Sequence, residues 1–296
     1  MTEDRLSGNL RYDAAADNPT RSAHAFGGPP KMTVCLTLDL EPDFGRRVPR
    51  AYTAWNADNI ERLIAHLAER NVPLTIFVVA ESLIAMPDVV ERFRKAGAEF
   101  HLHSYSHDLD RPDAVDEIQR GKEVFERHFG YPPAGYRAPE GRISPQGWHA
   151  LEREGFTFDA SIFPSFWPRP RYLQYAPRPF RVCNGRLVVV PAATLSPARL
   201  IVSVSWLKLL GWPLYRWLLA RAESPDPFLF GMHLHDLWAT RSASQLGAPW
   251  TWVYRRNNDD GFDMLVRFLN FMQARGERFE TVGTVVSRIM AGDVAC

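Results

Sequence analysis

Three histidines stand close together in the segment AEFHLHSYSHDLD, residues 98–110, at His101, His103 and His107. A structural histidine needs one partner and occurs singly. His103 and His107 are four residues apart, a spacing that places two side chains on one face of a helical turn. Neutral imidazoles are common ligands of divalent metals. The segment therefore indicates a metal site, with a solvated helix carrying two unrelated histidines as the alternative.

Further reactive side chains follow other segments that the sequence predicts as strands. The C-terminal ends of parallel barrel strands face one side, so loops that are distant in sequence meet there. Two histidines and one carboxylate form a ligand set that leaves positions for water and substrate. The candidates to join the histidine pair are Asp39, Glu41, Arg137, His233 and His235.

The alternation of short apolar runs with amphipathic segments predicts the fold class. Strands are expected at 31–40, 73–80, 99–104, 134–139 and 157–161, with helices of 10 to 17 residues between most of them. Strands separated by helices pair in parallel. This number of repeats favours a closed or nearly closed α/β barrel, and an open doubly wound sheet is the alternative.

The bulk composition excludes several classes of protein. The chain has 296 residues, 46% of them hydrophobic, and 35 basic residues against 34 acidic ones. This charge balance argues against a nucleic-acid binder. Cys35, Cys183 and Cys296 are odd in number and form no C-x-x-C pair, which argues against a disulfide framework and a thiolate zinc site. A reducing compartment fits best.

The N-terminal segment differs from the rest of the chain. Residues 1–30 are polar, lack the apolar stretch of a secretory signal, and end in Gly27-Gly28-Pro29-Pro30. We interpret 1–30 as a flexible leader and 31–296 as one catalytic domain, and we expect a cytoplasmic location.

The segment 200–220 is the most apolar stretch of the sequence. Lys208, Arg216 and the break at 211–213 make insertion across a bilayer costly, so we expect a helix that packs on the barrel. The alternative is peripheral contact with a membrane surface, because tryptophans beside cations are typical of an interfacial anchor. These tryptophans are Trp206, Trp212 and Trp217.

Five motifs in fixed order carry a resemblance to a known family. TLDLE, HSYSH, YRAPEG, FDASIFP and MHLHD resemble the successive motifs of the polysaccharide deacetylase family, carbohydrate esterase family 4. The resemblance covers residues 32 to about 285. It implies a distorted (β/α) barrel with about seven parallel strands. It also implies one divalent metal, usually zinc with cobalt, nickel or iron as alternatives, and hydrolysis of N-acyl groups on amino sugars.

Residue by residue, the resemblance implies a catalytic role for Asp39 as general base and makes His103 and His107 metal ligands. Arg137 would hold the carboxylate of the base. Most family members have a second aspartate as metal ligand in the first motif, where this chain has Leu40. A variant branch reads D-x-D or D-x-E.

That branch makes Glu41 the third ligand, with Asp43 as the alternative ligand. In the last motif the general acid is His233 or His235, and the resemblance leaves the choice open. For substrate binding we expect Glu140, which replaces the tyrosine usual in the third motif, together with Asp159 and Trp167.

The residues support the same chemistry without the resemblance. A metal on two imidazoles and one carboxylate lowers the pKa of bound water and polarises an amide carbonyl. A departing amine requires an acid, which a protonated histidine supplies. Arg137 would lower the pKa of Asp39 and fix its orientation.

These observations predict an enzyme, a metal-dependent hydrolase that removes an acetyl or formyl group from an amino sugar in envelope or exopolysaccharide biosynthesis. The substrate is expected to be soluble or lipid-linked, and in the second case the protein would act at the inner membrane surface. The alternatives are a metal amidohydrolase acting on a small non-sugar amide and an inactive carbohydrate-binding module.

Overall fold

The computed structural model describes residues 31–166, 168, 170–248, 250–256 and 261–292. These residues belong to one compact unit that begins at Lys31. The predicted leader, residues 1–30, lies outside the described residues.

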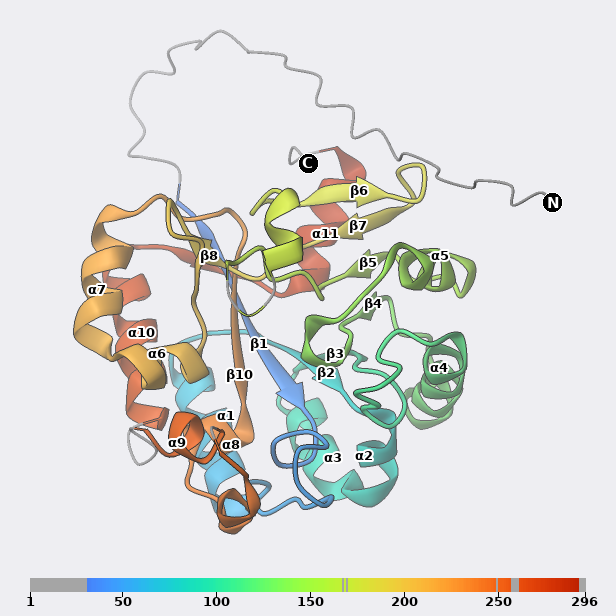
Figure 1. The fold of residues 1–296 in the computed structure, drawn as a ribbon, viewed down its shortest axis with the longest axis horizontal. Coiled ribbons are helices and arrows are strands. Elements are labelled where there is room, and N and C mark those ends of the chain that lie inside the picture. The colour runs from blue at the N-terminus through green and yellow to red at the C-terminus, as the bar shows by residue number, and fades with distance from the viewer. Residues whose placement is uncertain (1–30, 167, 169, 249, 257–260, 293–296) are drawn as a thin grey trace, which may run out of the picture. The chain divides into compact units, whose positions relative to one another are not determined.

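The described strands form a curled, mainly parallel sheet in the order β10-β1-β2-β3-β4-β5-β7-β6 (Figure 1). Seven of these strands pair in parallel, as the prediction of a distorted α/β barrel with about seven parallel strands requires. They are β1 (Thr33–Leu40), β2 (Leu74–Val78), β3 (Glu99–Leu102), β4 (Gly135–Tyr136), β5 (Phe158–Asp159), β7 (Leu187–Val189) and β10 (Phe228–His233). The prediction is confirmed.

Shorter strands complete the sheet and flank the place where its ends meet. β6 (Phe180–Val182) pairs antiparallel with β7, and β11 (Arg278–Phe279) pairs with β1. β8 (Thr194–Leu195) and β9 (Leu200–Ile201) form a separate hairpin. The segments after β7 reach β10 through two isolated parallel bridges, Ala192 to Leu229 and Ser203 to Gly231. The barrel therefore closes through isolated bridges instead of a continuous ladder.

Helices cover the outer face of the sheet, with α6, α7 and α10 on one flank and α4 and α5 on the other (Figure 1). Their apolar faces follow helical spacing; in α1, Ile60, Leu63 and Leu67 are buried. The helices are α1 (Ala57–Glu69), α2 (Ala80–Ala85), α3 (Pro87–Lys95), α4 (Val115–Phe129), α5 (Pro145–Arg153), α6 (Val204–Leu210), α7 (Trp212–Arg221), α8 (Leu234–Leu237), α9 (Trp250–Arg255), α10 (Gly261–Ala274) and α11 (Val282–Ala291), with 3₁₀ turns η1 (Pro139–Gly141), η2 (Pro170–Gln174) and η3 (Arg241–Gln245).

Strand alternation divides the core into two layers and directs the polar residues inward. In β1 the leucines Leu36, Leu38 and Leu40 pack with the helices, whereas Cys35 belongs to an inner cluster that includes Phe77, Phe158 and the apolar face of α11. Successive side chains of a strand point to opposite faces. Residues two apart in a strand share a face, so Thr37, Asp39 and the following Glu41 point into the barrel on the same side as Cys35.

The apolar segment 200–220 forms two helices, α6 and α7, which join at Gly211 with φ +89°. This join lies at the break that the sequence predicts. Trp206 and Trp212 are half-buried against the core, and Trp212 contacts Phe271 of α10 edge to face. Trp217 is about half exposed. Within the described residues, no helix combines the length and the apolar character needed to span a bilayer.

Candidate active site

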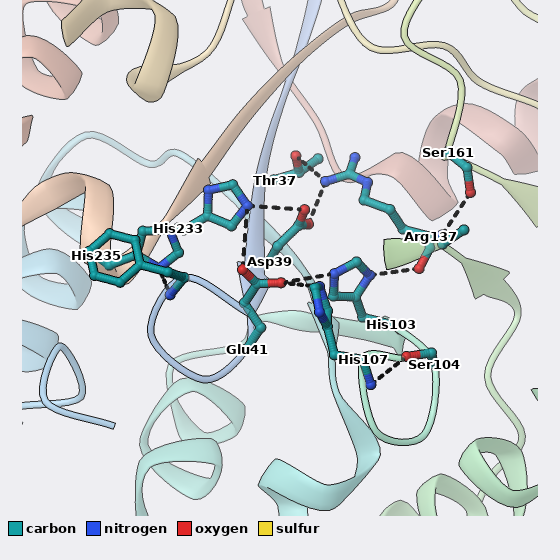
Figure 2. A network of polar contacts seen from close by, with 12 residues as sticks. Thr37, Asp39, Glu41, His103, Ser104, His107, Arg137, Ser161, His233 and His235 are labelled. Carbon is teal, nitrogen blue, oxygen red and sulfur yellow. Dashed lines mark hydrogen bonds and ion pairs between the residues drawn. The ribbon is translucent and has the colours of Figure 1, made fainter. Parts of the chain in front are cut away.

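Four strand ends bring the candidate residues together in the barrel mouth (Figure 2). Asp39 lies in β1 and is the register partner of His233 in β10, because these two strands are adjacent and parallel. His103 directly follows β3, and Arg137 directly follows β4. Residues nearly 200 positions apart in the sequence thus line one site.

Glu41, His103 and His107 form a buried cluster whose ligand atoms lie within 4.8 Å of one another. The Oε2 atom of Glu41 is 3.2 Å from Nε2 of His103 and 2.6 Å from Nε2 of His107. Burial opposes the charge on Glu41, but the two imidazoles outweigh it and hold the pKa of this carboxyl well below its usual value. The cluster therefore presents an ionised carboxylate between two imidazoles.

The hydrogen-bond pattern of this cluster fits a divalent cation. Nδ1 of His103 donates to the carbonyl oxygen of Arg137 at 2.6 Å. A carbonyl only accepts, so in the neutral ring the hydrogen is on Nδ1 and Nε2 turns a lone pair toward Glu41. Nδ1 of His107 is buried without a hydrogen-bond partner among the described residues. A buried carboxylate faced by two imidazole nitrogens is a donor set that suits a divalent cation.

A tight loop, and not the predicted helical turn, brings His107 to this cluster. Ser104 and His107 both have left-handed backbone conformations, with φ of +61° and +60°. The Ser104 hydroxyl accepts a hydrogen bond from the His107 backbone N–H at 3.0 Å. The expectation of one helical face was wrong because the strand β3 ends at Leu102 and the chain turns at once.

Gly45 makes room for the His107 ring. Its φ is +60°, and a Cβ at this position would lie 2.5 Å from Cε1 of His107. Any side chain here would displace the imidazole. The sequence analysis missed this residue; the glycine four positions after Glu41 was the available signal.

Arg137 contacts Asp39 in the structure. Its Nη1 atom donates to Oδ1 of Asp39 at 2.6 Å and to the Thr37 hydroxyl at 3.0 Å, and its Nε donates to the Ala160 carbonyl at 3.1 Å. The guanidinium lies 4.1 Å from the ring centre of Phe77. This buried, multiply bonded cation fixes the orientation of Asp39, and Oδ2 of Asp39 lies 3.7 Å from Nε2 of His233.

His233 carries a charge that its acidic neighbours stabilise. Its Nδ1 lies 2.7 Å from Oδ2 of Asp236, which also accepts from the His233 backbone N–H at 3.1 Å. Burial disfavours the imidazolium, but the carboxylates of Asp236, Glu41 and Asp39 outweigh burial and raise the pKa of His233 to about 10. The ring is therefore a proton donor at neutral pH.

His235 has the opposite character although it stacks on His233 at a centroid distance of 4.7 Å. Its Nδ1 accepts a hydrogen bond from the backbone N–H of Phe44 at 3.2 Å. Burial and the neighbouring charge of His233 lower the pKa of His235 to about 4. A neutral ring that accepts a hydrogen bond has no proton to supply on Nδ1.

Asp236 was not among the predicted site residues. It is fully buried, and His233 holds the pKa of its carboxyl below the usual value against the effect of burial. Asp236 lies three positions after His233, where its carboxylate caps the start of α8. The H-x-x-D spacing in the sequence was the signal for this pair.

Glu140, which the sequence analysis proposed as a substrate contact, lies at the cavity wall. It has a left-handed backbone conformation, with φ of +51°, and forms an ion pair with Arg47. The guanidinium of Arg47 also lies 3.9 Å above the ring of Trp250. A second predicted substrate contact, Trp167, lies outside the described residues.

Asp159 does not reach the cavity. It is fully buried and accepts hydrogen bonds from the indole N–H of Trp148 at 3.0 Å and from the Ser161 backbone N–H at 3.2 Å. Burial raises the pKa of its carboxyl to about 6. Phe158 belongs to the inner cluster, so its neighbour Asp159 points outward to α5. The predicted substrate contact at Asp159 therefore does not fit this structure.

Asp43 is also absent from the ligand cluster. Its carboxylate accepts from the backbone N–H groups of Thr53 and Ala54, at 2.9 and 3.1 Å, and from the Ser242 hydroxyl at 2.7 Å. These bonds satisfy the carboxylate and hold the loop after β1. Of the two carboxylates proposed as the third ligand, Glu41 is the one beside the histidines.

A cavity of about 480 Å³ opens over these residues. One part of it is lined by Asp39, Glu41, His103, His107 and His233. A substrate amide placed there would lie next to the candidate metal ligands, the carboxylate held by Arg137 and the charged imidazole.

Comparisons with known proteins agree with this geometry. Residues 27–158 match the family model described as polysaccharide deacetylase. A peptidoglycan-N-acetylglucosamine deacetylase of Bacillus cereus is 29% identical over 126 residues, which are 41% of this chain and 41% of the relative. The match thus spans about two fifths of that curated relative.

Two solved structures share the fold. A protein described as a polysaccharide deacetylase from Mycobacterium smegmatis aligns with a TM-score of 0.58 and 18% identity, over 93% of this chain and 96% of the other. An allantoinase aligns with the same TM-score at 16% identity, over 93% and 98%. The similarity to the polysaccharide deacetylase family model thus lies in residues 27–158, and the two solved structures show a fold that this chain shares with them.

Proposed function

We propose that this protein is a metal-dependent hydrolase that removes an N-acyl group, acetyl or formyl, from an amino sugar. The observation that carries the proposal is the convergence of Glu41, His103 and His107 beside two charged groups of opposite sign, Asp39 and His233. Amide hydrolysis needs a base for the water, an acid for the amine and stabilisation of the oxyanion. The site offers residues suited to each requirement.

Glu41, His103 and His107 would hold the metal, with zinc as the first candidate and cobalt, nickel or iron as alternatives. When bound, such an ion lowers the pKa of a coordinated water and polarises an amide carbonyl. Three protein ligands leave coordination positions for both.

The chain's own residues would move the protons. Asp39 would accept the proton of the attacking water, and the ion pair with Arg137 keeps its carboxyl group oriented. As the C–N bond breaks, His233 would deliver its proton to the departing amine, and Asp236 would hold the imidazole in place. The products are a carboxylic acid and a free amino group. We assign the acid role to His233 because His235 is neutral and buried.

An amino-sugar substrate is supported by the B. cereus relative, which is named as a peptidoglycan-N-acetylglucosamine deacetylase. A role in envelope or exopolysaccharide synthesis, in the cytoplasm, is part of the proposal and rests on the family motifs. Contact of the 200–220 helices with a membrane is a further part. It is supported by the exposed side chains of Leu210, Leu214 and Trp217, and co-sedimentation with anionic liposomes at low salt tests it.

The direct test is acyl release by the metal-loaded protein. We expect it to liberate acetate or formate from N-acylated amino sugars and to leave small non-sugar amides intact. Turnover of small amides alone would contradict the sugar substrate in favour of the amidohydrolase. Binding of sugars with a full metal complement and no turnover would contradict the enzyme in favour of the binding module.

A further inference from the structure

The cavity has a second end that the proposed reaction does not use. Beyond His233 it continues along the inner face of β10 to Gly231 and Leu229. Ala192, Ile201 and Val202, from the segments that follow β7, line the same end. This apolar end of the cavity lies where the sheet closes through two isolated bridges, Ala192 to Leu229 and Ser203 to Gly231.

Gly231 keeps this end open. It is two residues before His233 in β10, so both positions face the barrel interior. A Cβ at Gly231 would have the Thr37 hydroxyl at 3.8 Å and the Cβ of Ser203 at 4.0 Å as its nearest neighbours. A methyl group therefore fits, and a larger side chain would extend into the cavity. The missing side chain creates space one layer beneath the proposed acid.

The polar side chains near this end already have partners within the protein. The Ser205 hydroxyl donates to Asp236 at 2.8 Å, and the Ser203 hydroxyl accepts from the Trp206 backbone N–H at 3.4 Å. The Thr37 hydroxyl donates to the Phe230 carbonyl at 3.3 Å. Lys208, a buried cation on the same wall, lowers the pKa of Asp236.

Such a surface disfavours a sugar ring and favours a hydrocarbon. Sugar hydroxyls placed there would lose water without gaining matching hydrogen bonds, which is costly. Each methylene of a chain that leaves water for this wall would instead improve binding by a few-fold. The end opens into the same cavity as the metal ligands, so one substrate can occupy both parts.

We infer that the apolar end binds an alkyl chain of the substrate that is longer than the methyl of an acetyl group. This alkyl chain belongs either to the acyl group that is removed or to an aglycone on the sugar. This inference rests on the proposed function for its turnover test.

The test compares two pairs of substrates with metal-loaded wild-type protein. N-hexanoylglucosamine against N-acetylglucosamine tests an acyl chain, and the n-octyl against the methyl glycoside of N-acetylglucosamine tests an aglycone. We expect kcat/KM to be at least about tenfold higher for the longer member of one pair. The pair that shows the preference identifies the source of the chain.

Gly231→Leu fills the apolar end and should reduce that preference to about twofold or less. If Gly231→Leu does not fold, Gly231→Ala takes its place, because the structure accommodates a methyl group there. This smaller variant should reduce the preference by an intermediate amount. Gly247→Leu is the matched control, because Gly247 is exposed and a Cβ there has no neighbour within 4 Å. This control should keep the preference.

An active enzyme with no preference in either pair overturns the inference and leaves the proposed function standing. A preference that survives Gly231→Leu also overturns it. If none of the four compounds is hydrolysed, the proposed function fails, and calorimetric titration with n-octyl glucoside then tests the cavity alone. Binding to the wild type that weakens about tenfold in Gly231→Leu supports the inference. Equal binding or no binding refutes it.

Discussion

The two histidine pairs of the site, four and two residues apart in the sequence, have opposite character. His103 and His107 point their Nε2 atoms at one oxygen of Glu41. His233 and His235 instead stack nearly parallel, with an interplanar angle of 15°, and burial and neighbouring charges move their pKa values to about 10 and about 4. Residue type and spacing therefore identify reactive pairs, but the partners of each ring decide its chemistry.

Asp39 lies between the two pairs, and its replacement tests whether they act on one water. Asp39→Asn should lower kcat by about 100-fold or more, because it removes a positioned base. It should leave the metal stoichiometry unchanged, since Asp39 is outside the cluster of three ligands. Steady-state kinetics with a parallel metal assay measure both effects. If Asp39→Asn turned over near the wild-type rate, the two histidine pairs would not act together through Asp39.

Replacing the stacked histidines one at a time tests the difference within that pair. His233→Gln should reduce kcat by about 100-fold, the range expected for loss of a general acid. His235→Gln should reduce kcat by less than about tenfold, because a neutral ring with its Nδ1 already bonded donates no proton in the reaction. The ratio of the two kcat values is the readout. A larger loss in His235→Gln would reverse our assignment.

Asp236→Asn tests how the charge of His233 is maintained. Loss of this carboxylate should lower the pKa of His233 from about 10 and reduce kcat by roughly tenfold, as is common for an orienting partner. The His233 ring resonances in an NMR pH titration report the pKa. Asp263, an acid at the start of α10, offers Asp263→Asn as a control that should alter neither value. An unchanged His233 pKa in Asp236→Asn would refute the pairing.

Asp159 is a second buried acid and contrasts with Asp236 because no histidine holds its charge. Burial raises the folded-state pKa of Asp159 to about 6, above the ordinary aspartate value of 3.8, so the protonated form favours folding. This contribution to the free energy of unfolding is up to roughly 3 kcal/mol. It is complete below pH 3.8 and is lost as the pH rises through 6. Between pH 4 and pH 6 the free energy of unfolding in urea should therefore fall in the wild type relative to Asp159→Asn. A constant difference in unfolding free energy would contradict the raised pKa.

Much of the fold follows from the sequence because the signals are local. Apolar runs such as TVCLTLDL predict buried strands, and alternation within β1 predicts that Asp39 and Glu41 share a face. The end of a strand then predicts the position of His103 and Arg137. The closure at Ala192 depends on contacts between distant segments, and no local pattern encodes it.

The errors in the site arise where strands are short or the backbone turns. β5 has only two residues, so the outward direction of Asp159 is set by packing of Phe158 and not by a readable alternation. The two-residue spacing of His233 and His235 is that of one face of a strand. β10 ends at His233, however, and α8 brings the second ring beside the first.

Metal binding by the wild type, Glu41→Gln and Asp43→Asn tests the central claim most directly. Equilibrium dialysis against zinc, followed by elemental analysis, should find one ion per chain in the wild type and in Asp43→Asn, with circular dichroism to verify folding. Glu41→Gln should bind at least about tenfold more weakly, because it removes one of three ligands. Wild-type affinity in Glu41→Gln, or no stoichiometric ion in the wild type, would contradict the account.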